Sequence, residues 1–79
     1  MISKKRRALT TALLKALIEE YDSACTIARL LDIPAPTVQS WVHRGNISDY
    51  GLKLISGNEK MSEIYNRDEF ADIRSGSWY

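Results

Sequence analysis

The chain has 79 residues, of which 44% are hydrophobic and 27% are charged, and its formal net charge is +1. This length makes one small domain that buries only about 60% of the surface of its unfolded chain, and the composition is that of a folded globule rather than a disordered segment. No apolar run approaches the roughly 20 residues that span a bilayer, so we expect a cytoplasmic protein. The single cysteine, Cys25, excludes an internal disulfide, and its apolar helical surroundings predict a buried structural thiol.

Charge is unevenly distributed along the chain. The segment 59–72 carries five acidic residues, whereas a basic run lies near the N-terminus. Such asymmetry leaves a locally positive surface on a nearly neutral protein. The run is either a flexible basic arm that contacts DNA phosphates or a solubilising terminus. It consists of Lys4, Lys5, Arg6 and Arg7.

Two helices are predicted in the first part of the chain. The first covers Ala8 to Tyr21, where apolar residues recur at three- and four-residue steps. Asp22 or Ser23 can cap the second helix, which extends to Leu31. The apolar set of this second helix is Ala24, Ile27, Ala28, Leu30 and Leu31.

A third helix follows a break at two prolines. Pro34 disfavours helical geometry at Ile33, so the second helix ends before it. Pro36 is compatible with the first turn of the third helix, and Gly45 is a natural residue to end it. Two helices with so short a connection, the second beginning with prolines, have the layout of a helix-turn-helix.

The rest of the chain gives weaker signals. Ser48 is a plausible N-cap of a fourth helix that closes at 57–58, and residues 61–65 suggest a further short helix. The apolar side of the fourth helix is assigned to Tyr50, Leu54 and Ile55. The tail, 67–79, has no assigned structure. Its apolar mass either packs back on the domain or forms a dimer contact; it comprises Phe70, Ile73, Trp78 and Tyr79.

These elements predict an all-α fold: a small domain of four to five helices with a helix-turn-helix in a lambda-repressor-like arrangement. Residues 1–66 are expected to form the DNA-binding domain, with a recognition helix at about 35–44, and residues 67–79 the tail.

The register of the two central helices separates core positions from exposed ones. Small Ala28 suits a close helix crossing, and Val38 and Trp41 lie three apart on the third helix, where core packing is favoured over base stacking for the indole. The other positions then face outward. Their side chains suit base edges, since Gln pairs with adenine, Arg with guanine, and Ala or Pro packs on a thymine methyl. The predicted base-contacting residues are Ala35, Pro36, Gln39, Ser40, His43 and Arg44.

Contacts to DNA phosphates are predicted at helix starts and in the basic run. Ser23 and Thr26 can offer hydroxyl and helix-end N–H groups, although Ser23 is equally well explained as a cap. His43 either reads a base, contacts a phosphate or does neither. The predicted phosphate-contacting residues are Ser23, Thr26, Thr37, Lys4, Lys5, Arg6 and Arg7.

The stretch 26–47 resembles the helix-turn-helix of phage Cro-type repressors, especially the YdaS-like group. The shared features are Ala28, an apolar turn residue, the Val-x-x-Trp of 38–41 and the Arg-Gly-x-Ile of 44–47. Asp32 departs from the family, which has Gly in this turn, and the prolines at 34 and 36 replace polar residues. The resemblance covers 24–57, and the tail 70–78 is only faintly similar. It implies a transcriptional repressor that binds double-stranded operator DNA through the major groove, with a homodimer on two-fold operators.

Other functions are less favoured. One His, one Cys and no adjacent acid pair give no catalytic constellation, so we expect no enzyme, no metal, no cofactor, no small-molecule ligand and no membrane partner. Two alternatives stay open: an excisionase-like architectural DNA-binding protein, whose helix-turn-helix would be followed by a wing, and the antitoxin of a toxin–antitoxin pair.

Overall fold

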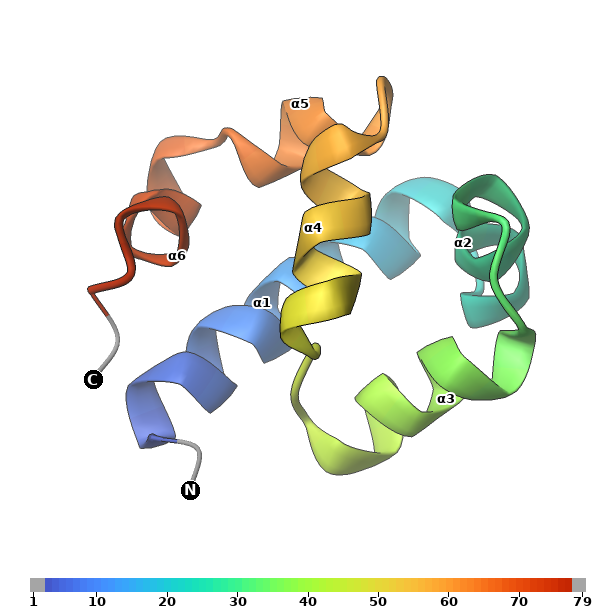
Figure 1. Ribbon diagram of the computed structural model, residues 1–79, viewed down its shortest axis with the longest axis horizontal. Helices are drawn as coiled ribbons and strands as arrows, with labels where there is room; N and C mark the ends of the chain where they lie inside the picture. The colour runs from blue at the N-terminus through green and yellow to red at the C-terminus, as the bar shows by residue number, and fades with distance from the viewer. Residues whose placement is uncertain (1–2, 78–79) are drawn as a thin grey trace.

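The computed structural model describes residues 3–77, which form helices joined by short connections (Figure 1). The elements in chain order are α1 (Lys4–Tyr21), α2 (Ala24–Leu31), α3 (Ala35–Arg44), α4 (Asp49–Gly57), α5 (Met61–Tyr65), the 3-10 turn η1 (Asp68–Phe70) and α6 (Ala71–Ser75). The all-α prediction is confirmed. The described chain has six α-helices rather than four or five, because the tail is itself helical. Within residues 3–77, no helix has the length and apolar content needed to cross a membrane.

Helix α1 begins earlier than predicted, at Lys4 instead of Ala8. Ser3 caps it, since its hydroxyl accepts a hydrogen bond from the backbone N–H of Arg6 at 3.1 Å. The basic run therefore forms the first turn of a helix. The expectation of a flexible basic arm is wrong.

The boundaries of α2 and α3 are as predicted. Ser23 caps α2 by accepting from the N–H of Thr26 at 3.2 Å. Asp32 ends α2 with φ 57°, in the left-handed region, and donates its N–H to Ala28 and Arg29. Aspartate tolerates this conformation better than most residues, so the turn forms without the glycine of the resembling family. Gly45 ends α3 in the same way, with φ 66°.

One hydrophobic core joins α1 to the central helices and the tail. Ala28 is buried where α2 packs against α3, and Trp41 is only 4% exposed, which confirms its core position. Three assignments are wrong. Cys25 is exposed, and Leu30 points partly to solvent. On α4 the core side is made by Gly51, Leu52 and Ile55, whereas Tyr50 is 62% exposed.

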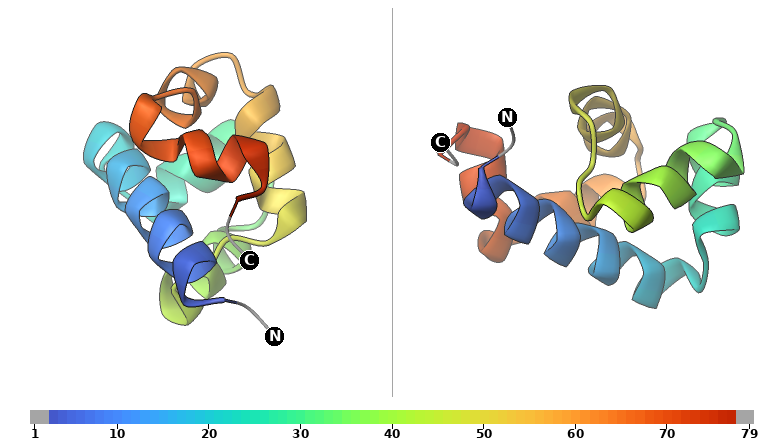
Figure 2. Two further views of the ribbon diagram at one scale, coloured as in Figure 1. Left: turned by 90° about the vertical axis from the view of Figure 1, so that its left-hand side faces the viewer. Right: turned by 90° about the horizontal axis from the view of Figure 1, so that it is seen from below.

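The tail belongs to the same core. Phe70 and Ile73 are buried with the α1 residues, so these two side chains contribute to the core of the domain, whereas a dimer contact by the tail stays a prediction. Figure 2 shows α6 beside the first turns of α1, where Lys5 Nζ lies 3.2 Å from Asp72 Oδ2. Trp78 and Tyr79, the other two residues predicted for this role, lie outside the described residues.

Gly51 lies on α4 directly against the side chains of Trp41 and Ile47. A Cβ there would lie 2.7 Å from Cη2 of Trp41 and 2.8 Å from Cγ2 of Ile47, both far inside van der Waals contact. We expect Gly51→Ala to lower the free energy of unfolding by about 1–3 kcal/mol through overpacking, despite the better helix propensity of alanine. Urea unfolding followed by circular dichroism measures this.

The matched control is Gly57→Ala on the same helix, because a Cβ at Gly57 meets nothing within 4 Å. Its stability should equal or exceed that of the unaltered protein by up to about 1 kcal/mol. Equal stability of the two variants would contradict the close approach of α3 and α4.

Candidate nucleic-acid interface

All six predicted base-contacting residues lie on α3, but they do not share one direction. At 100° per residue, Val38 and Trp41 face the core, and the opposite side of the helix is centred on Pro36 and His43. Gln39 and Ser40 flank that centre, while Ala35 and Arg44 lie at its two margins. Pro36, Gln39, His43 and Arg44 are exposed, and Ala35 and Ser40 are half-buried. The outer face of α3 is thus a short strip with His43 in its middle.

Val42 is a surface residue that the sequence reasoning did not select. It is 47% exposed although it is apolar, and it lies on the margin of α3 beside Ala35 and Gln39. An exposed methyl group next to polar side chains that are predicted to contact bases is suited to contact with a thymine methyl. The sequence contained a signal for this exposure. In the helical register of α3, Val42 is turned away from the core positions Val38 and Trp41 and toward the side of His43.

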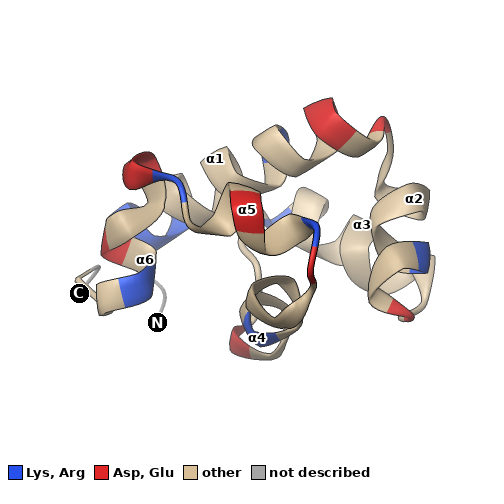
Figure 3. Cartoon of the chain, turned by 90° about the horizontal axis from the view of Figure 1, so that it is seen from above, with Lys and Arg blue, Asp and Glu red and all other residues tan. Residues whose placement is uncertain are grey.

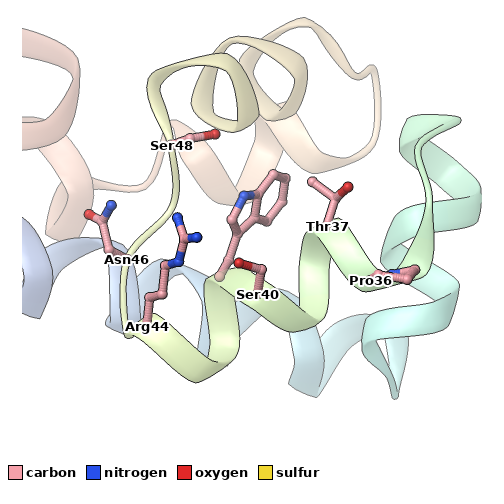
Figure 4. A pocket seen from close by; sticks show the side chains of 7 residues that line it. Pro36, Thr37, Ser40, Arg44, Asn46 and Ser48 are labelled. Atoms are coloured by element: carbon pink, nitrogen blue, oxygen red, sulfur yellow. The ribbon is translucent and has the colours of Figure 1, made fainter.

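A groove of about 410 Å³ runs along the other flank of α3, between this helix and its connection to α4 (Figure 4). Figure 4 shows the side chains of Arg44, Asn46 and Ser48 around one end of the groove, with Ser40 and Thr37 further along α3. The groove places Thr37, a predicted phosphate contact, next to three predicted base contacts, Pro36, Ser40 and Arg44. Its lining residues are Pro36, Thr37, Ser40, Trp41, Arg44, Asn46 and Ser48.

Helix α1 supports this groove from behind. The hydroxyl of Thr11 donates to the carbonyl oxygen of Gly45 at 2.8 Å, which ties the end of α3 to α1. Thr10 Oγ1 lies 2.9 Å from the carbonyl oxygen of Arg6 and 3.4 Å from Oδ1 of Asn46, a side chain that is only 8% exposed. Sequence reasoning missed Asn46. Its one signal was a polar residue directly after the glycine that ends α3.

The structure divides the basic run into two pairs. Lys5 lies against Asp72, and Nη2 of Arg6 lies 2.6 Å from Oδ1 of Asp49 and also donates to the carbonyl oxygen of Ile47 at 3.4 Å. Of the two remaining members, Arg7 lies beside the end of α3. The stem of Arg7 passes beside Gly45, since a Cβ on that glycine would lie 3.8 Å from Arg7 Cγ. Lys4 is exposed and shares that face of α1, one turn before Arg7. Arg7 is therefore the member of the basic run that lies next to the α3 surface, and phosphate contacts by the run stay a prediction.

Ser23 and Thr26 lie at the start of α2, away from the groove. Their hydroxyl oxygens are 3.1 Å apart, and Ser23 also accepts the N–H of Thr26. The geometry is that of a helix cap. A phosphate contact by either residue stays a prediction.

The surface around α3 carries no acidic group of its own. No Asp or Glu occurs between Asp32 and Asp49, and Asp49 is paired with Arg6. Figure 3 shows α3 free of acidic positions, while Asp and Glu gather at the end of α1, on α5 and near α6. The local charge on this face is therefore positive although the whole chain is nearly neutral.

Comparisons with protein-family models, with curated proteins and with solved structures find no match for this chain. The structure itself defines a small all-α domain. Within residues 3–77, no group of three or more His, Cys, Asp and Glu side chains is arranged to hold a metal ion. The exposed face of α3 and the adjoining groove are the features from which a function can be argued.

Proposed function

We propose that the protein is a sequence-specific DNA-binding transcriptional regulator, with α2 and α3 as a helix-turn-helix and α3 as the recognition helix. One observation carries the proposal: α3 packs on α2, buries Val38 and Trp41, and presents an acid-free polar strip on its other side. A helix face that contacts only water can carry acidic residues, whereas a face that contacts DNA phosphates is expected to lack them. The proposed action is Cro-like repression, in which a protein without an effector domain occupies a promoter that overlaps its operator.

The dimensions of α3 suit the major groove of DNA. A helix with its side chains is about 10–12 Å across, and the major groove is about 12 Å wide. The ten residues of α3 extend over about 15 Å, which corresponds to four or five base pairs at about 3.4 Å each. One copy of the domain thus reads a short site, and a homodimer on a two-fold operator would double its length.

The side chains on the strip have distinct roles in this proposal. Gln39 can accept from and donate to an adenine edge at once, which makes it the strongest candidate for sequence discrimination. His43, at the centre of the strip, is the side chain that enters deepest. Pro36 and Ala35 offer apolar contact at the start of the helix, where Pro36 removes an N–H donor.

The excisionase-like alternative is less well supported. Its helix-turn-helix would be followed by a wing of β-strands. After Ile47 the chain forms α4 instead, and residues 3–77 contain no strand.

Gln39→Ala should weaken binding to the preferred DNA sequence by about 1–3 kcal/mol. Binding to a duplex of unrelated sequence should change little, because the lost contact is to a base. Fluorescence anisotropy with both duplexes at fixed salt measures the two affinities. Lys15→Ala, an exposed change on α1, is the control and should leave both nearly unaltered. An equal loss on both duplexes would contradict base reading by Gln39.

A further inference from the structure

The indole N–H of Trp41 is a donor that forms no hydrogen bond within residues 3–77. The side chain is only 4% exposed, and it lines the groove beside α3. The nitrogen itself is not fully buried, so the N–H opens into this groove. A donor that opens into a groove is available to an acceptor outside the protein.

The orientation of the ring places this N–H at the α4 end of the groove. The Cζ2–Cη2 edge of the ring packs against Gly51, near the start of α4. Cζ2 is bonded to the carbon that carries Nε1, so the N–H lies on that same edge. Ser48, the N-cap of α4, lines the same groove.

Other donors converge on the space in front of the indole. Arg44 lies one turn after Trp41 on α3 and extends its guanidinium over the groove, as Figure 4 shows. Ser40 and Thr37 add hydroxyl groups. The start of α4 adds the positive end of its dipole, although the N–H of Gly51 already donates to the hydroxyl of Ser48. This set of donors is complementary to an anion with several oxygens.

We infer that this groove binds a backbone phosphate of nucleic acid, with the indole N–H of Trp41 and the guanidinium of Arg44 as its two main donors. The inference rests on the proposed function, because a helix that fills the major groove meets phosphates along both flanks. The groove lies on one of those flanks, about a quarter turn from the His43 strip. The one nearby carboxylate, Asp49, is paired with Arg6 and so opposes the anion less.

This assignment moves Arg44 from base reading to backbone binding. Arg44→Ala should then weaken binding by a similar factor on every DNA sequence and lower the salt dependence of the affinity by about one phosphate contact. A base-reading arginine would instead lose affinity only for its preferred sequence.

The test follows the indole N–H resonances of the ¹⁵N-labelled full chain by NMR, with Trp78→Phe used to assign the signal of Trp41. The protein is titrated with a short DNA duplex, with the same duplex carrying uncharged methylphosphonate linkages, and with inorganic phosphate. We expect the Trp41 signal to shift with the phosphodiester duplex and less with its uncharged counterpart. Trp41→Phe, which keeps an aromatic ring but lacks the N–H, should bind the duplex about tenfold more weakly.

The possible outcomes separate the two proposals. If backbone signals of Gln39 and His43 shift with DNA while the Trp41 indole does not, α3 binds DNA but the phosphate site is refuted. If the indole shifts equally with the uncharged duplex, the partner is not a phosphate. If inorganic phosphate shifts the indole but DNA shifts nothing, both proposals fail, since the groove is then an anion site that DNA does not use. If no titrant shifts any signal, both fail as well. Should Trp41→Phe not fold, the titrations of the unaltered protein still decide.

Discussion

Trp41→Ala is expected to lower the free energy of unfolding by about 3–5 kcal/mol, which leaves a domain of this size largely unfolded. Trp41 is almost fully buried, and its ring fills the space between α3 and α4 that Gly51 leaves open. Alanine would remove that contact and leave a cavity that the two helices cannot easily close. Urea titration followed by far-UV circular dichroism measures the loss.

Val42→Ala is the matched control for this change. Val42 is the next residue of the same helix and is 47% exposed, so its truncation should alter stability by no more than about 0.5 kcal/mol. A Trp41→Ala protein that unfolds at the same urea concentration as Val42→Ala would contradict the core position of the indole.

Phe70→Ala should have an effect of similar size, about 3–5 kcal/mol. Phe70 is 1% exposed and lies at the junction of η1 and α6, where it joins the core shared with α1. If the last segment were an accessory tail, the cost would be close to zero. The same urea titration distinguishes the two cases.

Tyr50→Ala serves as the control for Phe70, because it truncates an aromatic side chain that is 62% exposed. We expect a change within about 0.5 kcal/mol. If Phe70→Ala and Tyr50→Ala were equally mild, the tail would not contribute to the core, and residues 3–66 would be the folding unit.

The central part of the fold could be predicted because its signals are local. Ser23 as a cap, the break before Pro34 and Gly45 as the end of α3 each act on the backbone within a few residues. The burial of Trp41 followed from its spacing to Val38. These local rules needed no knowledge of the rest of the chain.

The errors arose where tertiary contacts decide. The stripe of α4 that faces the core passes through Gly51, which a pattern of apolar residues cannot reveal, so Tyr50 was assigned to the core in place of Leu52. The start of α1 depends on one hydrogen bond to Ser3, and charge alone suggested an arm. Cys25 lies in an apolar sequence but on the outer side of a short helix.

The candidate site shows the same division. Its outer strip follows from the register of α3, which the sequence contains. The groove could not be predicted from that register, because it combines Trp41 and Arg44 with Asn46 and Ser48 from the following connection. Their convergence depends on how α1 holds that connection through Thr11 and Gly45.

DNA recognition is tested most directly by selecting bound duplexes from a random-sequence pool with the unaltered protein and with Gln39→Ala in parallel. We predict that the unaltered protein enriches a common motif of about four or five base pairs. The motif should occur twice at a fixed spacing if a dimer binds. Gln39→Ala should relax the preference at one position, an adenine, and leave the others unchanged. Failure to enrich any sequence above the input pool, or the same motif from both proteins, would contradict base reading by α3.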